Sequence, residues 1–407
     1  ALIRKGGLGT PAIISVLFFV AYWVIDISGT KLARDGAVGP FHGVFFSSYI
    51  LLPTGLYLTW KAINDSSIFN MDAIKNGFRK LKSKIMGTFK KTRIVYMGTP
   101  EFAVAPLDEL IKTGHNIVGV VTVADKASGR GLKINESAVK KYAVEHNIPV
   151  LQPISLKDPE FLEALKAWKA DLFVVVAFRM LPKVVWSMPK LGTFNLHAAL
   201  LPQYRGAAPI NWAVINGEQK TGITTFLLNH EIDKGAIIGQ MEMPIGEDDT
   251  VGTMYDKLMV SGCDLVVDTV ERIAAGDYTA TEQMHIDEST LKPAPKIFKD
   301  DCRIDWSWDG RRIVNFVRGL SPYPAAWTPM FIDGQEQGSA KIFRATFAAA
   351  QHNQAAGAVY SDGKGSLKVA CADGWVEIHE LQVAGKRRMA TRDLLLGLRN
   401  IEDYTFA

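Results

Sequence analysis

The chain has 407 residues, 48% of them apolar, and its formal net charge at pH 7 is +4. This length allows two or three domains with sizeable cores. The mild charge excludes nucleic-acid binding through overall charge alone, so such a role would need local basic clusters. Cys263, Cys302 and Cys371 lie far apart and have no metal-ligand spacing, so the sequence indicates neither a disulfide framework nor a zinc site and predicts buried thiols in a reducing cytosol.

The first ninety residues differ in composition from the rest. Residues 8–27 and 44–60 are almost unbroken apolar runs, each near the ~20 residues that cross a bilayer as a helix. Basic residues flank the pair on its outer sides, so the positive-inside rule predicts a transmembrane hairpin over residues 1–70 with both ends in the cytoplasm. Two buried helices of a soluble domain are the alternative, which the missing polar face disfavours. Residues 71–91 follow as a basic linker.

Two short segments of this region point to a known family. Residues 4–9 and 61–67 resemble the C-terminal tail of lipopolysaccharide-export permeases of the LptF/LptG type. Two helices cannot build a permease core, and Met86 would be a natural start for a soluble enzyme. We therefore expect a fused or mis-called reading frame, in which the hairpin is a remnant or a membrane anchor.

From Arg93 onward, strand-like and helix-like segments alternate. Strands are expected at 93–98, 117–123, 171–177 and 192–196, and helices at 103–113, 137–146, 159–166 and 251–275. This alternation predicts an α/β domain over residues 92–295, with a doubly wound parallel sheet and its site beyond the carboxyl ends of the strands. A single glycine, Gly98, follows the first strand, so a dinucleotide fingerprint is not indicated.

Two prolines, Pro293 and Pro295, interrupt the α/β pattern. Beyond residue 303 the chain consists of short strand-like runs separated by turn sequences at 333–334, 361–365 and 373–374. Such spacing predicts a small β-barrel domain over residues 296–407.

The strand expected at 192–196 leads into the most informative motif. Asn195 and His197 stand two residues apart, which places both side chains on one face of an extended segment. An amide donor beside an imidazole is suited to stabilise an oxyanion and to move a proton at one reacting carbon. Asp233, in a loop further along the chain, offers a carboxylate that would orient the imidazole.

The segment 195–209, taken with 230–235, resembles the active site of the 10-formyltetrahydrofolate-dependent formyltransferases, and the methionyl-tRNA formyltransferase family most of all. Residues 304–306, 318–327 and 385–389 resemble the C-terminal domain of that family, an open barrel of the OB type. The resemblance covers nearly all of residues 92–407.

The resemblance implies that a formyl group passes from N10 of the folate to the free amine of methionyl initiator tRNA, without a metal. It assigns hydrogen-bond donation to the formyl oxygen to Asn195 and His197, and the imidazole tautomer and proton acceptance to Asp233. Ala199 stands where the family has a serine, so we expect somewhat weaker folate binding. The residues implied in folate binding are Ala199, Leu200, Leu201 and Pro202, with Phe178, Arg179 and Leu181 on the opposite wall.

The segment 125–133 resembles the acceptor-stem loop of the same family, and a flexible charged surface loop is the alternative. The residues expected to contact tRNA are Arg130, Lys133, Arg205, Lys386, Arg387 and Arg388. We expect a monomer whose catalytic region is cytoplasmic. An amino-sugar or purine formyltransferase and a formyltetrahydrofolate hydrolase stay open as other functions, although the basic barrel favours tRNA.

Overall fold

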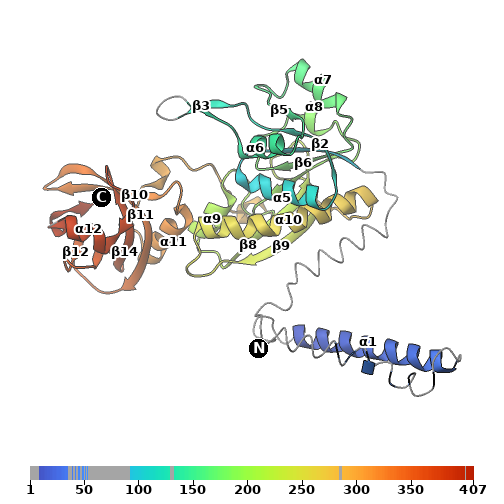
Figure 1. Cartoon of the computed structure of the whole chain (residues 1–407). Helices are drawn as coiled ribbons and strands as arrows, with labels where there is room; N and C mark the ends of the chain where they lie inside the picture. Colours follow the sequence, from blue (N-terminus) through green and yellow to red (C-terminus); the bar gives the residue numbers. More distant parts are fainter. Residues whose placement is uncertain are drawn as a thin grey trace. The chain divides into compact units, whose positions relative to one another are not determined.

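The computed structural model describes residues 9–34, 39, 42, 45, 48–49, 51, 53, 92–128, 133–283, 287–398 and 400–407. The chain divides into two compact units, residues 1–88 and 89–407, which are described separately (Figure 1).

The first unit contains the helix α1 (Gly9–Arg34). Charged residues occupy its second half, with Asp26 inside the helix and Lys31 and Arg34 in its last turn. These residues shorten the apolar part, and no helix within the described residues is both long and apolar enough for a bilayer crossing. The predicted transmembrane hairpin therefore finds no support. Most of its second run, 44–60, and the predicted linker, 71–91, lie outside the described residues.

The second unit begins with a seven-stranded sheet in the order β5-β2-β1-β6-β7-β8-β9. The first five strands of this order, β5, β2, β1, β6 and β7, pair in parallel. Strand β8 runs antiparallel to β7, and β9 runs antiparallel to β8. The strands that the sequence pattern predicted are parallel, as expected, and the antiparallel pairs involve β8 and β9, which it did not predict. Only residues 228–236 join β8 to β9, which is too short for the crossover that a parallel pair requires. The strands are β1 (Arg93–Gly98), β2 (Asn116–Val121), β5 (Val150–Leu151), β6 (Leu172–Val176), β7 (Thr193–His197), β8 (Lys220–Leu227) and β9 (Ile237–Pro244).

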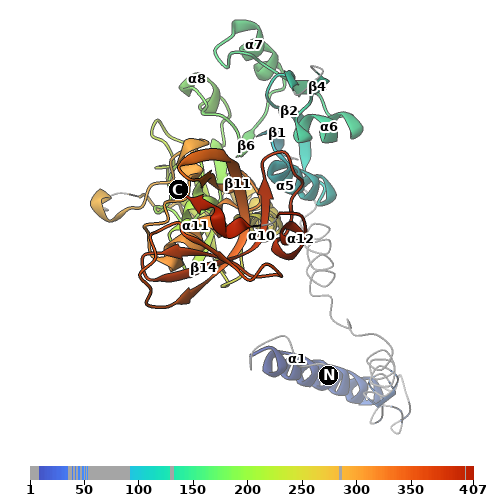
Figure 2. The ribbon, with the colours of Figure 1, turned by 90° about the vertical axis from the view of Figure 1, so that its left-hand side faces the viewer.

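Helices cover both faces of this sheet. Buried residues of α5, α6, α9 and α10 form one core against it, and those of α7 and α8 form another, with α6 and α8 on opposite sides in Figure 2. The longest of the helices that cover this sheet, α10, starts at a capping box on Thr250 and ends at Gly276 in the left-handed region. The helices are α5 (Glu101–Lys112), α6 (Ala138–Glu145), α7 (Pro159–Ala167), α8 (Lys183–Trp186), α9 (Pro209–Ile215) and α10 (Val251–Ala275).

Two short strands lie within and beside the segment 125–133, which was expected to form an RNA-binding loop. Strands β3 (Lys126–Ser128) and β4 (Lys133–Asn135) pair antiparallel. Residues 129–132, which include the predicted tRNA contact Arg130, lie outside the described residues.

A second, antiparallel sheet follows, in the order β12-β13-β14-β11-β10-β16, and β15 pairs with β14. An isolated bridge between Ala358, next to β12, and Thr405 of β16 joins the two ends of this order, so the sheet closes like a barrel. The elements are β10 (Ala326–Ile332), β11 (Gln335–Ala349), β12 (Val359–Ser361), β13 (Leu367–Cys371), β14 (Gly374–Val383), β15 (Met389–Ala390), β16 (Thr405–Phe406), α11 (Gly310–Leu320), α12 (Thr391–Gly397) and the short 3₁₀ helices Glu288–Thr290, Asp300–Cys302 and Ile401–Asp403.

Helix α11 of the barrel domain lies against α9 of the first domain (Figure 1). Asn211 donates a hydrogen bond from its amide to the carbonyl of Gly319 at 2.8 Å. Arg318 donates to the carbonyl of Asp249 at 2.8 Å and to that of Gly246 at 2.6 Å. Because these bonds join helix and loop ends of both domains, the barrel is fastened to the α/β domain through side chains of α9 and α11.

Candidate functional site

Strand β7 carries Asn195 and His197 to its end on one face, as the spacing predicts. The His197 side chain is 6% exposed. Asn195 is half-buried, and within the described part of the chain its amide has no hydrogen-bond partner. A half-buried amide without a partner is available to an oxygen of a bound molecule.

The hydrogen bonding of His197 defines its tautomer. Its Nε2 lies 2.8 Å from the carbonyl oxygen of Tyr204. A carbonyl only accepts, so Nε2 must carry the hydrogen, and in the neutral ring Nδ1 then holds a lone pair. Nδ1 faces Oδ2 of Asp233 at 3.8 Å, which is too long for a direct hydrogen bond. The tautomer is therefore set by Tyr204, and not by Asp233 as the sequence analysis expected.

Asp233 is held in place by its backbone and by its carboxylate. Its Oδ2 accepts a hydrogen bond from the amide of Gly206 at 3.0 Å. The side-chain amide of Gln283 donates to the carbonyls of Asp233 and Gly235, at 3.1 and 2.7 Å, and its oxygen accepts from Arg205 at 2.8 Å. The structure thus brings the three predicted catalytic residues together and adds Tyr204 and Gln283, which the sequence analysis missed.

Unusual backbone conformations cluster around these residues. Ala177, Tyr204 and Asp233 have φ values of 46°, 59° and 53°, in the left-handed region that side chains other than glycine disfavour. Gly206 has a φ of 128°, and a Cβ at this position would lie 2.4 Å from the carbonyl oxygen of Ala294. Such strain persists where surrounding structure enforces it, often at functional sites.

The predicted folate loop is fixed to β8 and β9. Thr224 donates from its hydroxyl to the carbonyl of Ala199 at 2.7 Å and accepts from the amide of Leu201 at 3.1 Å. Gln240 donates to the carbonyl of Leu201 at 2.7 Å. Ala199 is 0% and Leu201 3% exposed, and Leu200 lies against Gly222 of β8. The side chains of Ala199 and Leu201 are therefore covered by protein, and folate contact by this loop stays a prediction.

The predicted opposite wall follows β6. Arg179 donates from its guanidinium to the carbonyls of Pro153 and Ile154, which ties this segment to the loop after β5. Leu181 is buried and Phe178 is half-buried. These hydrogen bonds connect the segment to the loop after β5, and its role in folate binding stays a prediction.

The cations predicted to contact tRNA lie in separate parts of the second unit. Lys133 belongs to β4, and Arg205 lies at the candidate site, bound to Gln283. Lys386 and Arg387 are exposed in the turn between β14 and β15. The neighbouring residue, Arg388, instead forms two hydrogen bonds to Glu380, at 2.8 and 2.7 Å, and its guanidinium lies 4.1 Å from the centre of the Phe343 ring. This guanidinium is engaged within the barrel.

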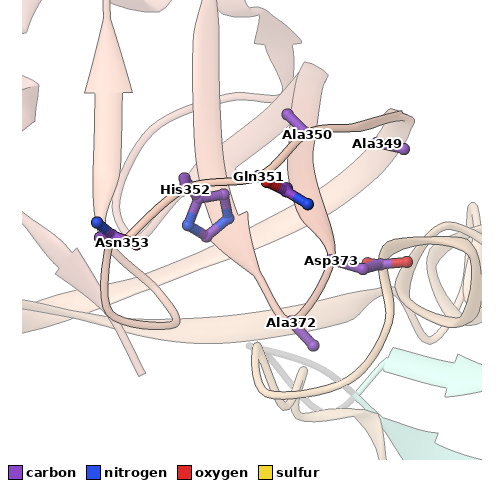
Figure 3. Close-up of a pocket in the computed structure, with 7 residues that line it drawn as sticks. All are labelled: Ala349, Ala350, Gln351, His352, Asn353, Ala372 and Asp373. Atoms are coloured by element: carbon purple, nitrogen blue, oxygen red, sulfur yellow. The ribbon is translucent and has the colours of Figure 1, made fainter.

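A broad hollow of about 890 Å³ lies in the barrel domain, away from the predicted catalytic residues in sequence (Figure 3). His352 donates from Nε2 to the carbonyl of Gly374 at 2.9 Å, and Asp373 accepts from the amide of Gly310 at 2.8 Å. Both side chains hold neighbouring loops, so the hollow offers little chemistry of its own. It is lined by Ala349, Ala350, Gln351, His352, Asn353, Ala372 and Asp373.

Comparisons with known proteins bear on this site. A family model described as formyl transferase matches residues 91–270, and one described as formyl transferase, C-terminal domain, matches residues 296–399. The chain is 54% identical to the methionyl-tRNA formyltransferase of Bacteroides fragilis, over 77% of this chain and 97% of that protein. The identity to that of Parabacteroides distasonis is also 54%, over 77% of this chain and 98% of that protein.

A solved structure of a sugar 3N-formyl transferase matches with a TM-score of 0.52 and 20% identity, over 73% of this chain and 99% of that chain. At this identity the likeness shows the fold alone. None of these matches supports the resemblance of residues 4–9 and 61–67 to an export permease.

Proposed function

Because the chain belongs to the methionyl-tRNA formyltransferase family, we propose that it transfers the formyl group of 10-formyltetrahydrofolate to the free amino group of methionyl initiator tRNA. The observation that carries the proposal is the pair formed by Asn195 and His197 on β7, with Nδ1 of His197 facing the Asp233 carboxylate at 3.8 Å. Residues 92–295 supply the chemistry in this proposal, and residues 296–407 contact the tRNA.

The proposed roles follow from the hydrogen bonds of the site. The amine attacks the formyl carbon, and Asn195 donates its free amide hydrogen to the oxygen that becomes negative. Since the Nε2 hydrogen of His197 is engaged by Tyr204, we assign His197 no hydrogen bond to the formyl oxygen, which differs from the role expected from the sequence; instead, Nδ1 accepts the proton that leaves the amine. Asp233 then faces an imidazolium and stabilises its charge. Nδ1 returns this proton to N10 as the bond between N10 and the formyl carbon breaks, so atoms and charges balance.

Binding of the two substrates is assigned to the segments that flank this centre. The loop of residues 199–202 and the segment 178–182 form the folate pocket in our proposal. Lys386, Arg387 and the segment 125–133 contact the tRNA backbone, with Arg205 closest to the reacting end. We place the reaction in the cytoplasm, where the initiator tRNA is charged.

An assay with three acceptors tests the proposal. The chain is incubated with 10-formyltetrahydrofolate and either methionyl initiator tRNA, a nucleotide-linked amino sugar or no acceptor, and the release of tetrahydrofolate is measured. We expect release only with the charged tRNA, together with formylmethionine recovered from it. Faster turnover with the amino sugar would contradict the proposed acceptor, and equal release without acceptor would identify a hydrolase.

A further inference from the structure

The amide, the carbonyl and the hydroxyl of Tyr204 all form hydrogen bonds, although the proposed reaction does not use its side chain. Its carbonyl accepts from Nε2 of His197 at 2.8 Å, and its own amide donates to the carbonyl of Lys292 at 2.8 Å. The residue is 5% exposed and has a φ of 59°. A tyrosine in this conformation costs about 1–3 kcal/mol, so neighbouring contacts must hold it there.

The side chain of Tyr204 is anchored through a chain of charged and polar groups. Its hydroxyl donates to Oε1 of Glu218 at 2.6 Å and accepts from the amide of Asn216 at 3.1 Å. Lys292 donates from Nζ to the same oxygen of Glu218 at 2.6 Å. The Tyr204 hydroxyl is therefore bound by Asn216 and Glu218, which are close in sequence, and Glu218 is in turn bound by Lys292 from a distant segment.

At neutral pH, Glu218 is ionised and the Tyr204 hydroxyl is protonated. Burial opposes the charge on Glu218, but hydrogen bonds from Lys292 and Tyr204 outweigh it and hold the pKa of this carboxyl below its usual value. Burial and the bond to Glu218 raise the pKa of the Tyr204 hydroxyl. The phenol therefore stays protonated and the carboxylate ionised, which gives a charge-assisted hydrogen bond of the stronger kind.

We propose that Tyr204 is a positioning residue for His197: its side chain, anchored by Glu218 and Lys292, holds the carbonyl that keeps the hydrogen on Nε2 and leaves Nδ1 free toward Asp233. A neutral imidazole without such a partner exists in both tautomers, and only the one with a bare Nδ1 accepts a proton at that nitrogen. This inference rests on the proposed function, in which His197 moves the proton.

The anchor also connects the site to the segment that leads into the barrel. Beside Lys292, Ala294 donates from its amide to the carbonyl of Arg205 and accepts from the amide of Ala207, both at 2.8 Å. The stretch 292–294 thus pairs with the chain around Tyr204 on its way to the barrel domain. In our proposal, Lys292, near the end of the α/β domain, influences the tautomer of His197 through Glu218 and Tyr204.

Nitrogen-15 spectroscopy of the histidine rings in the full chain tests the inference. The chain has 8 histidines, and a His197→Ala variant identifies the His197 signal by its loss. At a pH where this ring is neutral, we expect a protonated Nε2 and a bare Nδ1. In Tyr204→Phe, which keeps the backbone but loses the hydroxyl, we expect a mixture of tautomers. The kcat should fall ~10-fold, as one charge-assisted bond predicts, with the KM for folate unchanged.

Tyr142→Phe is the matched control, because its hydroxyl also donates to a carboxylate, that of Asp108 at 2.8 Å, between α6 and α5. It should leave the His197 signal and kcat unchanged. Glu218→Gln keeps an acceptor for the phenol and should retain more activity than Glu218→Ala, which provides a second reading if Tyr204→Phe is unstable.

Three results separate the inference from the function on which it rests. A hydrogen on Nδ1 in the unaltered chain would overturn the inference, whatever the activity. A Tyr204→Phe variant with the wild-type tautomer and kcat would show that the backbone alone holds the carbonyl, and would overturn it too. By contrast, full turnover by His197→Ala would overturn the proposed function, while the tautomer could still be read from the spectra of the unaltered chain.

Discussion

The carboxylate of Asp233 makes two different contacts at the site. It accepts a hydrogen bond from the amide of Gly206 and also faces the free nitrogen of His197 at 3.8 Å. The first contact needs only an acceptor, and the second needs a negative charge. The two contacts can therefore be separated by exchanging the carboxylate for an amide of the same size.

We predict that Asp233→Asn folds normally but turns over ~10²- to 10³-fold more slowly, because a charge at about this distance contributes up to ~4 kcal/mol toward a nearby imidazolium. Steady-state kinetics and thermal melting are the measurements. Asp277→Asn, an exposed exchange beyond α10, is the control and should change neither. A kcat for Asp233→Asn within threefold of wild type would refute the proposed role.

Spacing and resemblance led to Asn195, His197 and Asp233, and the structure places the last two side by side. Tyr204 and Gln283 were not foreseeable in the same way. Tyr204 acts through its backbone carbonyl and a left-handed φ, which no side-chain motif encodes. Gln283 reaches the carbonyl of Asp233 across 50 residues of chain, a contact that only the tertiary fold creates.

Among the elements, β8 (Lys220–Leu227) is a strand that the sequence pattern did not predict. Six consecutive residues of this strand are buried, because helices and loops cover both of its faces. Continuous burial is the pattern of a central parallel strand. The sequence therefore contains little to mark β8 as antiparallel, whereas the matching bounds of α10 follow from a long helical period with Thr250 and Gly276 at its ends.

Substitutions of two neighbouring threonines of β8 should have different effects, one on folate binding and the other on stability. Thr224→Val removes the hydroxyl that holds Ala199 and Leu201, so we expect the KM for 10-formyltetrahydrofolate to rise roughly 5- to 10-fold, in line with ~1–1.5 kcal/mol for a lost bond. Thr225→Val removes an equally buried hydroxyl whose partner is Thr269, at 2.9 Å. It should lower the melting temperature without changing KM. An equal rise in KM for both variants would count against the folate loop.

The turn between β14 and β15 contains cations that should differ in their contribution to tRNA binding. The logarithm of the tRNA binding constant falls linearly with the logarithm of the salt concentration. Lys386→Ala and Arg387→Ala should each reduce the magnitude of this slope by about 1, as expected for one lost phosphate contact. Arg388→Gln, whose guanidinium is engaged by Glu380 and Phe343, should leave that slope unchanged and cost less than ~1 kcal/mol of stability, since the ion pair is partly exposed. Titrations at several salt concentrations measure the slopes. Identical slopes for all three variants and the wild type would exclude this turn from the tRNA interface.

For the whole molecule, the division into residues 1–88 and 89–407 is the main feature. The matched family models begin at residue 91 and end at residue 399, within the second unit. We therefore predict that the fragment 86–407 formylates methionyl initiator tRNA with a kcat/KM within about twofold of the full chain, because no proposed site residue lies before residue 92. Parallel assays of fragment and full chain decide this, and a loss of more than tenfold in the fragment would assign a catalytic contribution to the first unit.

The central claim is that Asn195 and His197 transfer a formyl group to methionyl initiator tRNA, and single-turnover formylation by Asn195→Ala tests it most directly. Excess enzyme and 10-formyltetrahydrofolate are mixed with charged initiator tRNA, and formylmethionine is followed in time. The account predicts a rate ~10²- to 10³-fold below wild type, the usual cost of one lost oxyanion donor, with an unchanged melting temperature. Formylation by Asn195→Ala at the wild-type rate would contradict it.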